Sequence, residues 1–167
     1  MYTAILTGAA SSLPDLPLPI SYISASLKRT GRDYIQFVCG GALHLVDDVI
    51  ARQAGEELIL YQAGSDITRV NFNDFDYAEG ARSGSITLSG YKQVSYSGSA
   101  QTVDTVIEYD GDFDNPTANK RMVIGWENLG TIYPDDTVTW DGKSLTVDTL
   151  LFSLGAQGAR VEIKEDP

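Results

Sequence analysis

The sequence predicts a mainly β protein with a β-sandwich or β-barrel-like fold and one short helix at about residues 44–53. Three observations lead to this prediction. Apolar and polar residues alternate in many short runs, which is typical of strands that bury one face. Glycine-containing turns separate these runs at intervals of roughly 8–15 residues, as in sandwiches and barrels. An Asp-Gly pair at 141–142 also divides two such runs, and this pair favours a tight hairpin turn.

The first two predicted strands form a hairpin over residues 20–39. Its first half alternates, with Ile23, Ala25 and Leu27 on one face and serines on the other. A Thr-Gly-Arg-Asp turn then leads into a second apolar strand that ends at Cys39. This cysteine is predicted to be a small core residue, and a reactive thiol is the alternative.

The short helix follows a Gly-Gly break after the hairpin. Four apolar residues recur at helical spacing over this stretch: Leu45, Val46, Val49 and Ile50. His44 lies near the start of the helix, where a lone histidine is expected to be a surface or capping residue.

The rest of the chain adds alternating runs that predict strands at 57–62, 67–75, 83–91, 102–109, 121–126, 137–140, 143–147, 150–154 and 160–164. In the run 67–75, Ile67 and Arg69 compete with Val70 and Phe72 for the core face. The serine-rich stretch 92–102 is predicted to be a polar connection. Residues 20–167 are therefore expected to form a single β domain, with a possible boundary between two lobes near 92–102.

Residues 1–19 are predicted to form an N-terminal extended arm. Three prolines within six residues exclude a helix and favour extended backbone. The leucines of this segment need a surface to bury against, either on their own domain or on a neighbouring chain: Leu13, Leu16 and Leu18.

The charge balance excludes several classes of partner. The chain has 12 Lys and Arg against 23 Asp and Glu, a formal net charge of -11. A nucleic-acid-binding protein needs a basic footprint, and here the only basic cluster is Lys28, Arg29 and Arg32. Specific nucleic-acid binding is therefore not expected. The sequence also has no 18-residue apolar stretch, so no membrane span is predicted.

The sequence offers no catalytic set. One cysteine excludes a cysteine-based zinc site, and one histidine excludes a histidine-pair metal site. Any catalytic triad would have to use His44, and no Gly-x-Ser-x-Gly elbow or phosphate-binding loop is present. We therefore predict no enzyme activity, no cofactor, and neither catalytic nor metal-ligating residues.

Two acidic groups are candidates for a catalytic or metal-binding role. Residues 110–115 carry carboxylates at positions 1, 3 and 5 of a calcium-type loop. Asn115 occupies the sixth position, which needs glycine, and Arg121 occupies the twelfth, which needs glutamate, so a solvated loop is expected instead. Paired carboxylates could act on a sugar, but nothing in the sequence fixes the second group in a cleft: Asp74, Asp76 and Glu79.

Several short motifs occur in a characteristic order. They are Ser-Tyr-Ile-Ser-Ala-Ser-Leu-Lys-Arg-Thr-Gly and Tyr-Ile-Gln-Phe-Val within 17–38, Asp-Val-Ile-Ala-Arg and Gly-Glu-Glu-Leu-Ile within 48–59, Ala-Arg-Ser-Gly-Ser-Ile-Thr-Leu-Ser-Gly at 81–90, Tyr-Pro-Asp-Asp-Thr-Val at 133–138, Gly-Lys-Ser-Leu-Thr-Val at 142–147 and Arg-Val-Glu-Ile-Lys at 160–164. In this order the motifs resemble the small tail-tip or baseplate proteins of tailed bacteriophages. The chain departs from that pattern at Asp135, where glycine is usual.

The resemblance implies a structural protein of the virion, located at the distal end of the tail and related to tail hub and distal tail proteins. It implies assembly with copies of itself in a symmetric ring, a trimer or a hexamer, and with other phage tail proteins. The implied location is the virion tail, after synthesis in the host bacterial cytoplasm. No catalytic residues come with the resemblance.

Tyrosine is common in this chain, and nine tyrosines suit protein interfaces because each combines an apolar ring with a polar tip. Ordinary β propensity is the alternative explanation. With the leucines of the arm, we expect an assembly interface that includes Leu13, Leu16, Leu18, Tyr22, Tyr34 and Tyr133.

Two other functions stay open at this point. A carbohydrate-binding β-sandwich on a virion or cell surface would use Trp126 and Trp140, and burial of both indoles would remove it. A wall-degrading enzyme would need a cleft with two carboxylates, which the sequence does not indicate.

Overall fold

A computed structural model describes residues 2–52, 55–78, 84–156 and 158–167. The chain divides into two compact units. Unit 1 comprises residues 1–24 and 34–92, and unit 2 comprises residues 25–33 and 93–167. The division therefore passes through the hairpin predicted at 20–39 and falls again at the start of the serine-rich stretch. The single β domain expected over residues 20–167 stays a prediction.

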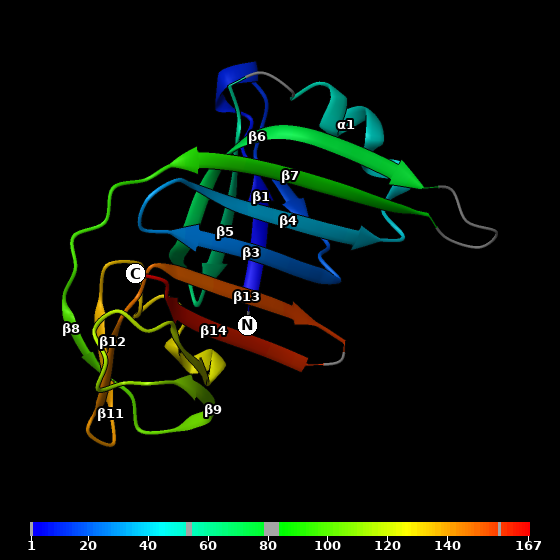
Figure 1. Cartoon of the computed structure of the whole chain (residues 1–167). Helices are drawn as coiled ribbons and strands as arrows, with labels where there is room; N and C mark the ends of the chain where they lie inside the picture. Colours follow the sequence, from blue (N-terminus) through cyan, green and yellow to red (C-terminus); the bar gives the residue numbers. More distant parts are fainter. Residues whose placement is uncertain (1, 53–54, 79–83, 157) are drawn as a thin grey trace. The chain divides into compact units, whose positions relative to one another are not determined.

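The described residues confirm the prediction of a mainly β protein with a short helix (Figure 1). Their strands are β1 (Tyr2–Leu6), β2 (Leu16–Leu18), β3 (Tyr22–Lys28), β4 (Arg32–Gly40), β5 (Glu57–Gln62), β6 (Ser65–Ala78), β7 (Ser85–Gln93), β8 (Ala100–Thr102), β9 (Val106–Gly111), β10 (Lys120–Ile124), β11 (Thr137–Trp140), β12 (Lys143–Thr146), β13 (Thr149–Gly155) and β14 (Gly158–Glu165). Their helical segments are η1 (Ala9–Ser11), η2 (Leu43–Leu45), α1 (Val46–Ile50) and η3 (Trp126–Asn128).

Unit 1 contains a sheet with the strand order β2-β1-β5-β6-β7-β4, to which the start of β3 belongs. Strand β1 pairs antiparallel with β2 on one side and with β5 on the other. Leu6 is fully buried, and Ala4 is 2% exposed. The N-terminal segment therefore differs from the predicted extended arm, because Tyr2–Leu6 supplies an interior strand of its own unit.

A β-bulge decides which residues of β6 face the core. The register of β5 and β6 pairs Leu60 with Thr68 and Tyr61 with Asp66, which leaves Ile67 as an extra residue. Such an insertion shifts the alternation of the strand by one position. Ile67 therefore faces inward together with Val70. Arg69, which alternates with Ile67 in the sequence, stays exposed.

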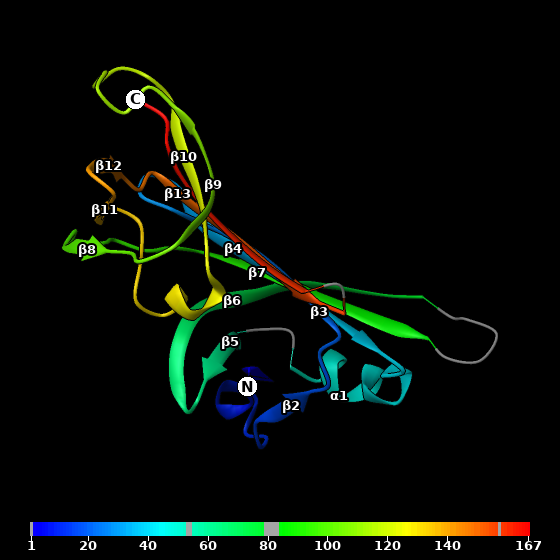
Figure 2. The ribbon, with the colours of Figure 1, turned by 90° about the horizontal axis from the view of Figure 1, so that it is seen from below.

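Unit 2 contains the rest of β3 and a sheet that continues in the order β13-β14-β10-β9. Strands β13 and β14 form an antiparallel hairpin, and β10 pairs with both β14 and β9. Figure 2 shows β9 and β10 running side by side. A second, three-stranded sheet has the order β12-β11-β8, in which β8 pairs parallel to β11. The sequence missed β8, which lies in the stretch predicted to be a connection.

The Asp-Gly hairpin at 137–147 is confirmed. Asp141 and Gly142 have φ values of 48° and 74°, the positive pair that a type I′ turn requires. The turn places Trp140 directly opposite Lys143 in the register of β11 and β12.

Each unit has its own apolar core. In unit 1 the largest fully buried side chains include Phe37, Leu58 and Ile86, and in unit 2 they include Leu27, Met122 and Ile124. The sandwich arrangement that the sequence predicts stays a prediction.

Candidate assembly surfaces

The three leucines predicted to form an interface lie in different environments within unit 1. Leu13 is 37% exposed, Leu16 is half-buried in β2, and Leu18 is 6% exposed. Leu18 pairs with Ala4 in the register of β1 and β2. It therefore contributes to the core of its own unit, whereas Leu13 offers an apolar side chain to the surface.

The proline-rich segment (residues 13–19) is fixed to unit 1 by a buried glutamate before β5. Glu56 is 1% exposed and accepts three hydrogen bonds from the turn that precedes this segment. Thr7 Oγ1 donates to Glu56 Oε2 at 2.5 Å, and the Ser11 backbone N–H and hydroxyl donate to Oε1 at 2.9 and 3.2 Å. A buried carboxylate is stable only when donors replace its lost water, and this turn supplies them.

A buried arginine holds the proline-rich segment from the other side. Arg52, 4% exposed, follows α1 and donates from Nη2 to the backbone carbonyl of Pro14 at 2.6 Å. Its Nη1 donates to the carbonyl of Asp48 at 2.8 Å. The segment is thus held in one conformation with several side chains exposed: Leu13, Pro14, Asp15, Pro17 and Pro19.

Tyr22 and Tyr34, predicted for the interface, are both at the surface. They are 44% and 39% exposed, and they point away from the core because their strand neighbours Ile23 and Ile35 are buried. The structure does not bring the two tyrosines together. They lie at opposite ends of the hairpin, since the Ser21 N–H bonds to the Val38 carbonyl near its open end.

Tyr133, the last predicted interface residue, is half-buried within unit 2. Its ring stacks on Tyr96, with centroids 6.0 Å apart. The Tyr96 hydroxyl donates to Asp33 Oδ2, and the Lys28 N–H donates to Asp33 Oδ1 at 3.0 Å. Burial raises the pKa of Asp33 above its usual value, although both hydrogen bonds act in the opposite direction. Tyr133 therefore packs inside its own unit, which the sequence did not reveal.

Asp135 adopts the left-handed conformation that explains a preference for glycine at this position. Its φ is 73°, a value that residues with a Cβ rarely adopt. The side chain compensates in part, because Oδ2 accepts the Gly98 N–H at 3.1 Å and Oδ1 lies 3.7 Å from Arg29.

Unit 2 carries an aromatic surface that the sequence did not predict. It consists of Tyr109 from β9, Phe113 from the following turn, Trp140 from β11 and Lys143 from β12. The Tyr109 ring lies 5.3 Å from Trp140 and 6.2 Å from Phe113, centroid to centroid. Lys143 Nζ lies 5.2 Å from the Tyr109 centroid and 5.3 Å from the Trp140 centroid. Tyr109 is nevertheless 49% exposed, so this surface is open to a partner.

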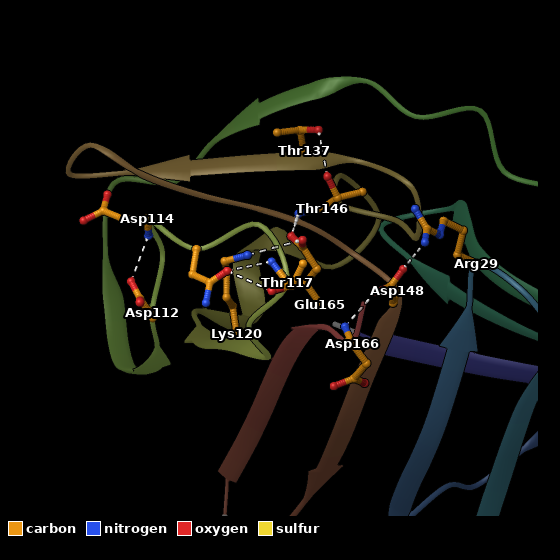
Figure 3. Close-up of polar contacts among 11 residues, drawn as sticks. Arg29, Asp112, Asp114, Thr117, Lys120, Thr137, Thr146, Asp148, Glu165 and Asp166 are labelled. Carbon is orange, nitrogen blue, oxygen red and sulfur yellow. Dashed lines mark hydrogen bonds and ion pairs between the residues drawn. The ribbon is translucent and has the colours of Figure 1, made fainter.

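The C-terminal residues are fastened to unit 2 by carboxylates (Figure 3). Asp148 pairs with Arg29 at 2.5 Å and accepts the Asp166 N–H at 2.7 Å. Glu165 accepts the Thr146 N–H at 2.5 Å and lies 3.4 Å from the buried Nζ of Lys120. These contacts anchor the end of β14.

A shallow pocket of about 130 Å³ lies beside this anchor, lined by Asp110, Asn119, Lys120, Arg121, Lys164 and Asp166. Its three cations already have carboxylate partners among the described residues. Lys120 pairs with Glu165, Arg121 with Glu108 and Lys164 with Glu162. The pocket therefore gives no strong reason for an anion to bind.

The acidic groups considered as sites are solvated. In the loop at 110–115, Asp110 and Asp112 accept hydrogen bonds from the backbone of Gly111 and Asp114. Asp74 and Asp76 lie exposed on β6, and Glu79 is outside the described residues. Within the described ranges, no group of three or more His, Cys, Asp or Glu could hold a metal ion.

The lone histidine and the lone cysteine both belong to unit 1. His44 is exposed in η2, as expected. Cys39 is 1% exposed, and burial raises its pKa to about 11, so the thiol is a core residue. No helix among the residues that the structure describes is long and apolar enough to cross a membrane.

No protein-family model matches this chain, and no curated protein matches it. The fold, however, is similar to solved tail proteins. The tail protein from Neisseria meningitidis MC58 has a TM-score of 0.63 and 8% identity, covering 98% of this chain and 95% of that chain. The 43 kDa tail protein of prophage MuSo2 from Shewanella oneidensis has a TM-score of 0.65 and 8% identity, covering 98% and 97%.

A third similar structure is the E. coli c3393 protein, with a TM-score of 0.66 and 3% identity, covering 90% of this chain and 74% of that chain. It is a component of the type VI secretion system with structural similarity to the T4 bacteriophage tail proteins gp27 and gp5. The resemblance to phage tail proteins is thus confirmed at the level of the fold: this chain has a fold similar to that of solved tail proteins, one of them from a prophage.

Proposed function

We propose that this protein is a structural component of a bacteriophage tail tip or baseplate, acting as a hub or distal tail ring protein. The observation that carries the proposal is the fold, which the Neisseria tail protein and the prophage MuSo2 tail protein share over 98% of this chain. Fold alone does not determine function, so the proposal also depends on the surfaces. Exposed tyrosines and a fixed, exposed proline-rich segment suit protein contacts better than they suit catalysis.

The proposal includes self-assembly and location. Copies of the chain form a symmetric ring, a trimer or a hexamer, and other tail proteins bind to it. The protein is made in the host bacterial cytoplasm and ends in the virion tail. It transforms no substrate, and the tyrosines on the outward face of the β3–β4 hairpin contribute to the ring contacts: Tyr22 and Tyr34.

The test is the number of copies in the assembled particle. Native mass spectrometry of the purified chain is expected to show a closed oligomer, and negative-stain images are expected to show a ring with three-fold or six-fold symmetry. A chain that stays a single copy at every concentration would contradict the proposal, because mass action favours a ring as concentration rises.

Matched variants test the tyrosines. The double variant Tyr22→Ser/Tyr34→Ser is expected to shift the oligomer toward single copies, because each tyrosine contributes apolar area to the contact. Tyr77→Ser is the control, since Tyr77 is 51% exposed on β6 and was not predicted to be in the interface. Equal oligomer content in the double variant and the unmodified chain would remove these tyrosines from the interface.

Carbohydrate binding is the second candidate, because neither indole is fully buried. Trp126 is 49% exposed, and Trp140 is half-buried beside Tyr109. Aromatic rings at a surface can stack on the apolar face of a sugar. Calorimetric titration with soluble cell-wall polysaccharide tests this function, because its signal does not depend on the tryptophans themselves. A saturable change that Trp126→Ala abolishes would favour it over a purely structural role.

A further inference from the structure

We infer that the proline-rich segment of one copy binds the aromatic surface of a second copy. This inference rests on the proposed function, because it names the contact through which copies of the chain join. It uses two sets of side chains that are at least partly exposed: the prolines and Asp15 of residues 13–19 in unit 1, and the rings around Tyr109 in unit 2.

The proline-rich segment is preformed as an extended ligand. Pro14, Asp15, Leu16 and Pro17 form a Pro-x-x-P sequence, and each proline fixes φ near −65°. β2 pairs with β1, while Glu56 holds the preceding turn. Because these contacts already fix the backbone, binding would lose little conformational entropy. The prolines of this segment are exposed: Pro14, Pro17 and Pro19.

The aromatic surface has the composition that extended proline-rich segments recognise. Such segments dock on aromatic-lined grooves, where proline rings pack against tyrosine and tryptophan. Tyr109 lies between Phe113 and Trp140, with centroid distances of 6.2 and 5.3 Å. Aromatic side chains are rigid and lose few rotamers when a partner covers them, so these three rings suit an interface.

Charge complementarity favours a second copy as the occupant. The proline-rich segment carries the exposed carboxylate of Asp15, and the aromatic surface carries the ammonium of Lys143. Lys143 lies 3.9 Å from Asp141, whose side chain is 75% exposed, and such a pair is weak in water. Lys143 can therefore exchange this partner for Asp15 of another copy.

The symmetry of this contact agrees with a ring. The two surfaces are different patches of the chain, so the contact is heterologous and repeats from one copy to the next. Each copy then donates its proline-rich segment to one neighbour and accepts a segment from the other. A heterologous contact closes into a ring when the rotation between copies divides a full turn.

Two measurements test the inference. The first is titration of the chain with a synthetic peptide of residues 11–19, capped at both ends, followed by tryptophan fluorescence. The peptide is expected to bind and to compete with assembly. A peptide with alanine at Pro14, Pro17 and Pro19 is expected to bind at least about tenfold more weakly. Tyr109→Ala is expected to weaken binding by at least about tenfold, whereas Trp126→Ala is the control outside the surface.

The second measurement is a charge swap, read by native mass spectrometry. Lys143→Glu is expected to reduce the oligomer, because it places a like charge opposite Asp15. Asp15→Lys is expected to do the same, and the double variant Asp15→Lys/Lys143→Glu is expected to restore the oligomer. Restoration separates a direct contact from a loss of folding, which the double variant would not repair.

Each result decides the inference separately from the proposed function. An intact ring in Tyr109→Ala, with no rescue in the double variant and no peptide binding, would overturn the inference and leave the proposed function standing. A chain that never forms an oligomer counts against the proposed function itself, and the peptide titration then decides the inference alone.

Discussion

Asp141 and Ala63 occupy equivalent positions in two hairpin turns, and they suit these turns to different degrees. Asp141 and Gly142 have positive φ values, as do Ala63 and Gly64, at 50° and 83°, in the turn between β5 and β6. Asp-Gly suits such a turn, because aspartate tolerates the left-handed conformation and glycine has no Cβ. Ala63 has neither advantage, so its turn stores strain of about 1–2 kcal/mol.

Ala63→Asn is therefore expected to stabilise the protein by about 0.5–1 kcal/mol, since asparagine is favoured at this position of a type I′ turn. Equilibrium unfolding in urea measures the change in free energy. Asp141→Asn is the matched control and is expected to change stability little, because aspartate already suits that turn. A less stable Ala63→Asn variant would contradict the argument.

Asp33 makes stability depend on pH. Burial raises its pKa above the usual value of 3.8, so the folded protein holds a proton at this carboxyl more tightly than the unfolded chain does. The stability that Asp33 contributes therefore increases as pH falls through the folded pKa, and it is fully present below 3.8. The charged form is the less favourable one in the folded state.

Asp33→Asn removes this dependence. The free energy of unfolding of the unmodified chain, relative to the variant, is expected to rise as the pH is lowered from neutral toward the usual pKa of the carboxyl. Urea unfolding at a series of pH values measures this difference. A difference that stays constant, or that falls on acidification, would show that Asp33 is not the titrating group.

At the scale of elements, the N-terminal strands depend on a side chain far away in sequence. Glu56 accepts three hydrogen bonds from Thr7 and Ser11, which precede the proline-rich segment. Without this carboxylate, the half-buried donors of Thr7 and Ser11 would lose their partner. Residues 2–11 are therefore held at two places. Strand β1 pairs with β5 at one of them, and Glu56 accepts the hydrogen bonds from Thr7 and Ser11 at the other.

Glu56→Ala is expected to lower the free energy of unfolding by about 1–3 kcal/mol, since it leaves the half-buried donors of Thr7 and Ser11 unsatisfied. Glu56→Gln keeps one acceptor and is expected to lower it by less. Glu57→Gln is the control, because Glu57 is partly exposed and pairs with Arg69 and Lys92, so its loss is expected to be under about 1 kcal/mol. Amide exchange of residues 2–18 that is faster in Glu56→Ala but not in Glu57→Gln would show that the lost stability lies in the N-terminal strands.

At the scale of the whole molecule, charge opposes assembly. The net charge of -11 makes copies repel one another, and salt screens this repulsion over about 10 Å at 0.1 M. Higher salt is therefore expected to shift the chain toward the oligomer. Sedimentation velocity at several salt concentrations measures the shift. Dissociation in high salt would indicate that ion pairs, rather than apolar contacts, hold the copies together.

The alternation of residues predicted most strands, including β5 at 57–62 and the hairpin at 137–147. Alternation failed to predict the strands that form mainly because a neighbouring strand offers hydrogen-bonding partners. Strand β2 contains Pro17 and spans three residues, and β8 also spans three. Such short segments become strands only because β1 and β11 offer hydrogen-bonding partners, so local sequence carries little signal for them.

The predicted interface residues also fall into a group that the structure leaves exposed and a group that it does not. Leu13, Tyr22 and Tyr34 are exposed, as an interface residue needs to be, but Leu18 and Tyr133 pack within their own units. The sequence could not separate these cases, because exposure depends on which distant residues cover a side chain. The aromatic surface was missed for the same reason, since Tyr109 and Trp140 are 31 positions apart and meet through separate sheets.

The amino-acid order alone determined the β class, the short helix and the type I′ turn, and it showed that the sequence holds no Gly-x-Ser-x-Gly or phosphate-loop motif, because each follows from neighbouring residues. Tertiary structure alone decided that Tyr2–Leu6 is an interior strand, that the chain forms two compact units, and that three rings and a lysine share one surface. These features arise from contacts between residues distant in sequence, and such contacts form only when the whole chain packs.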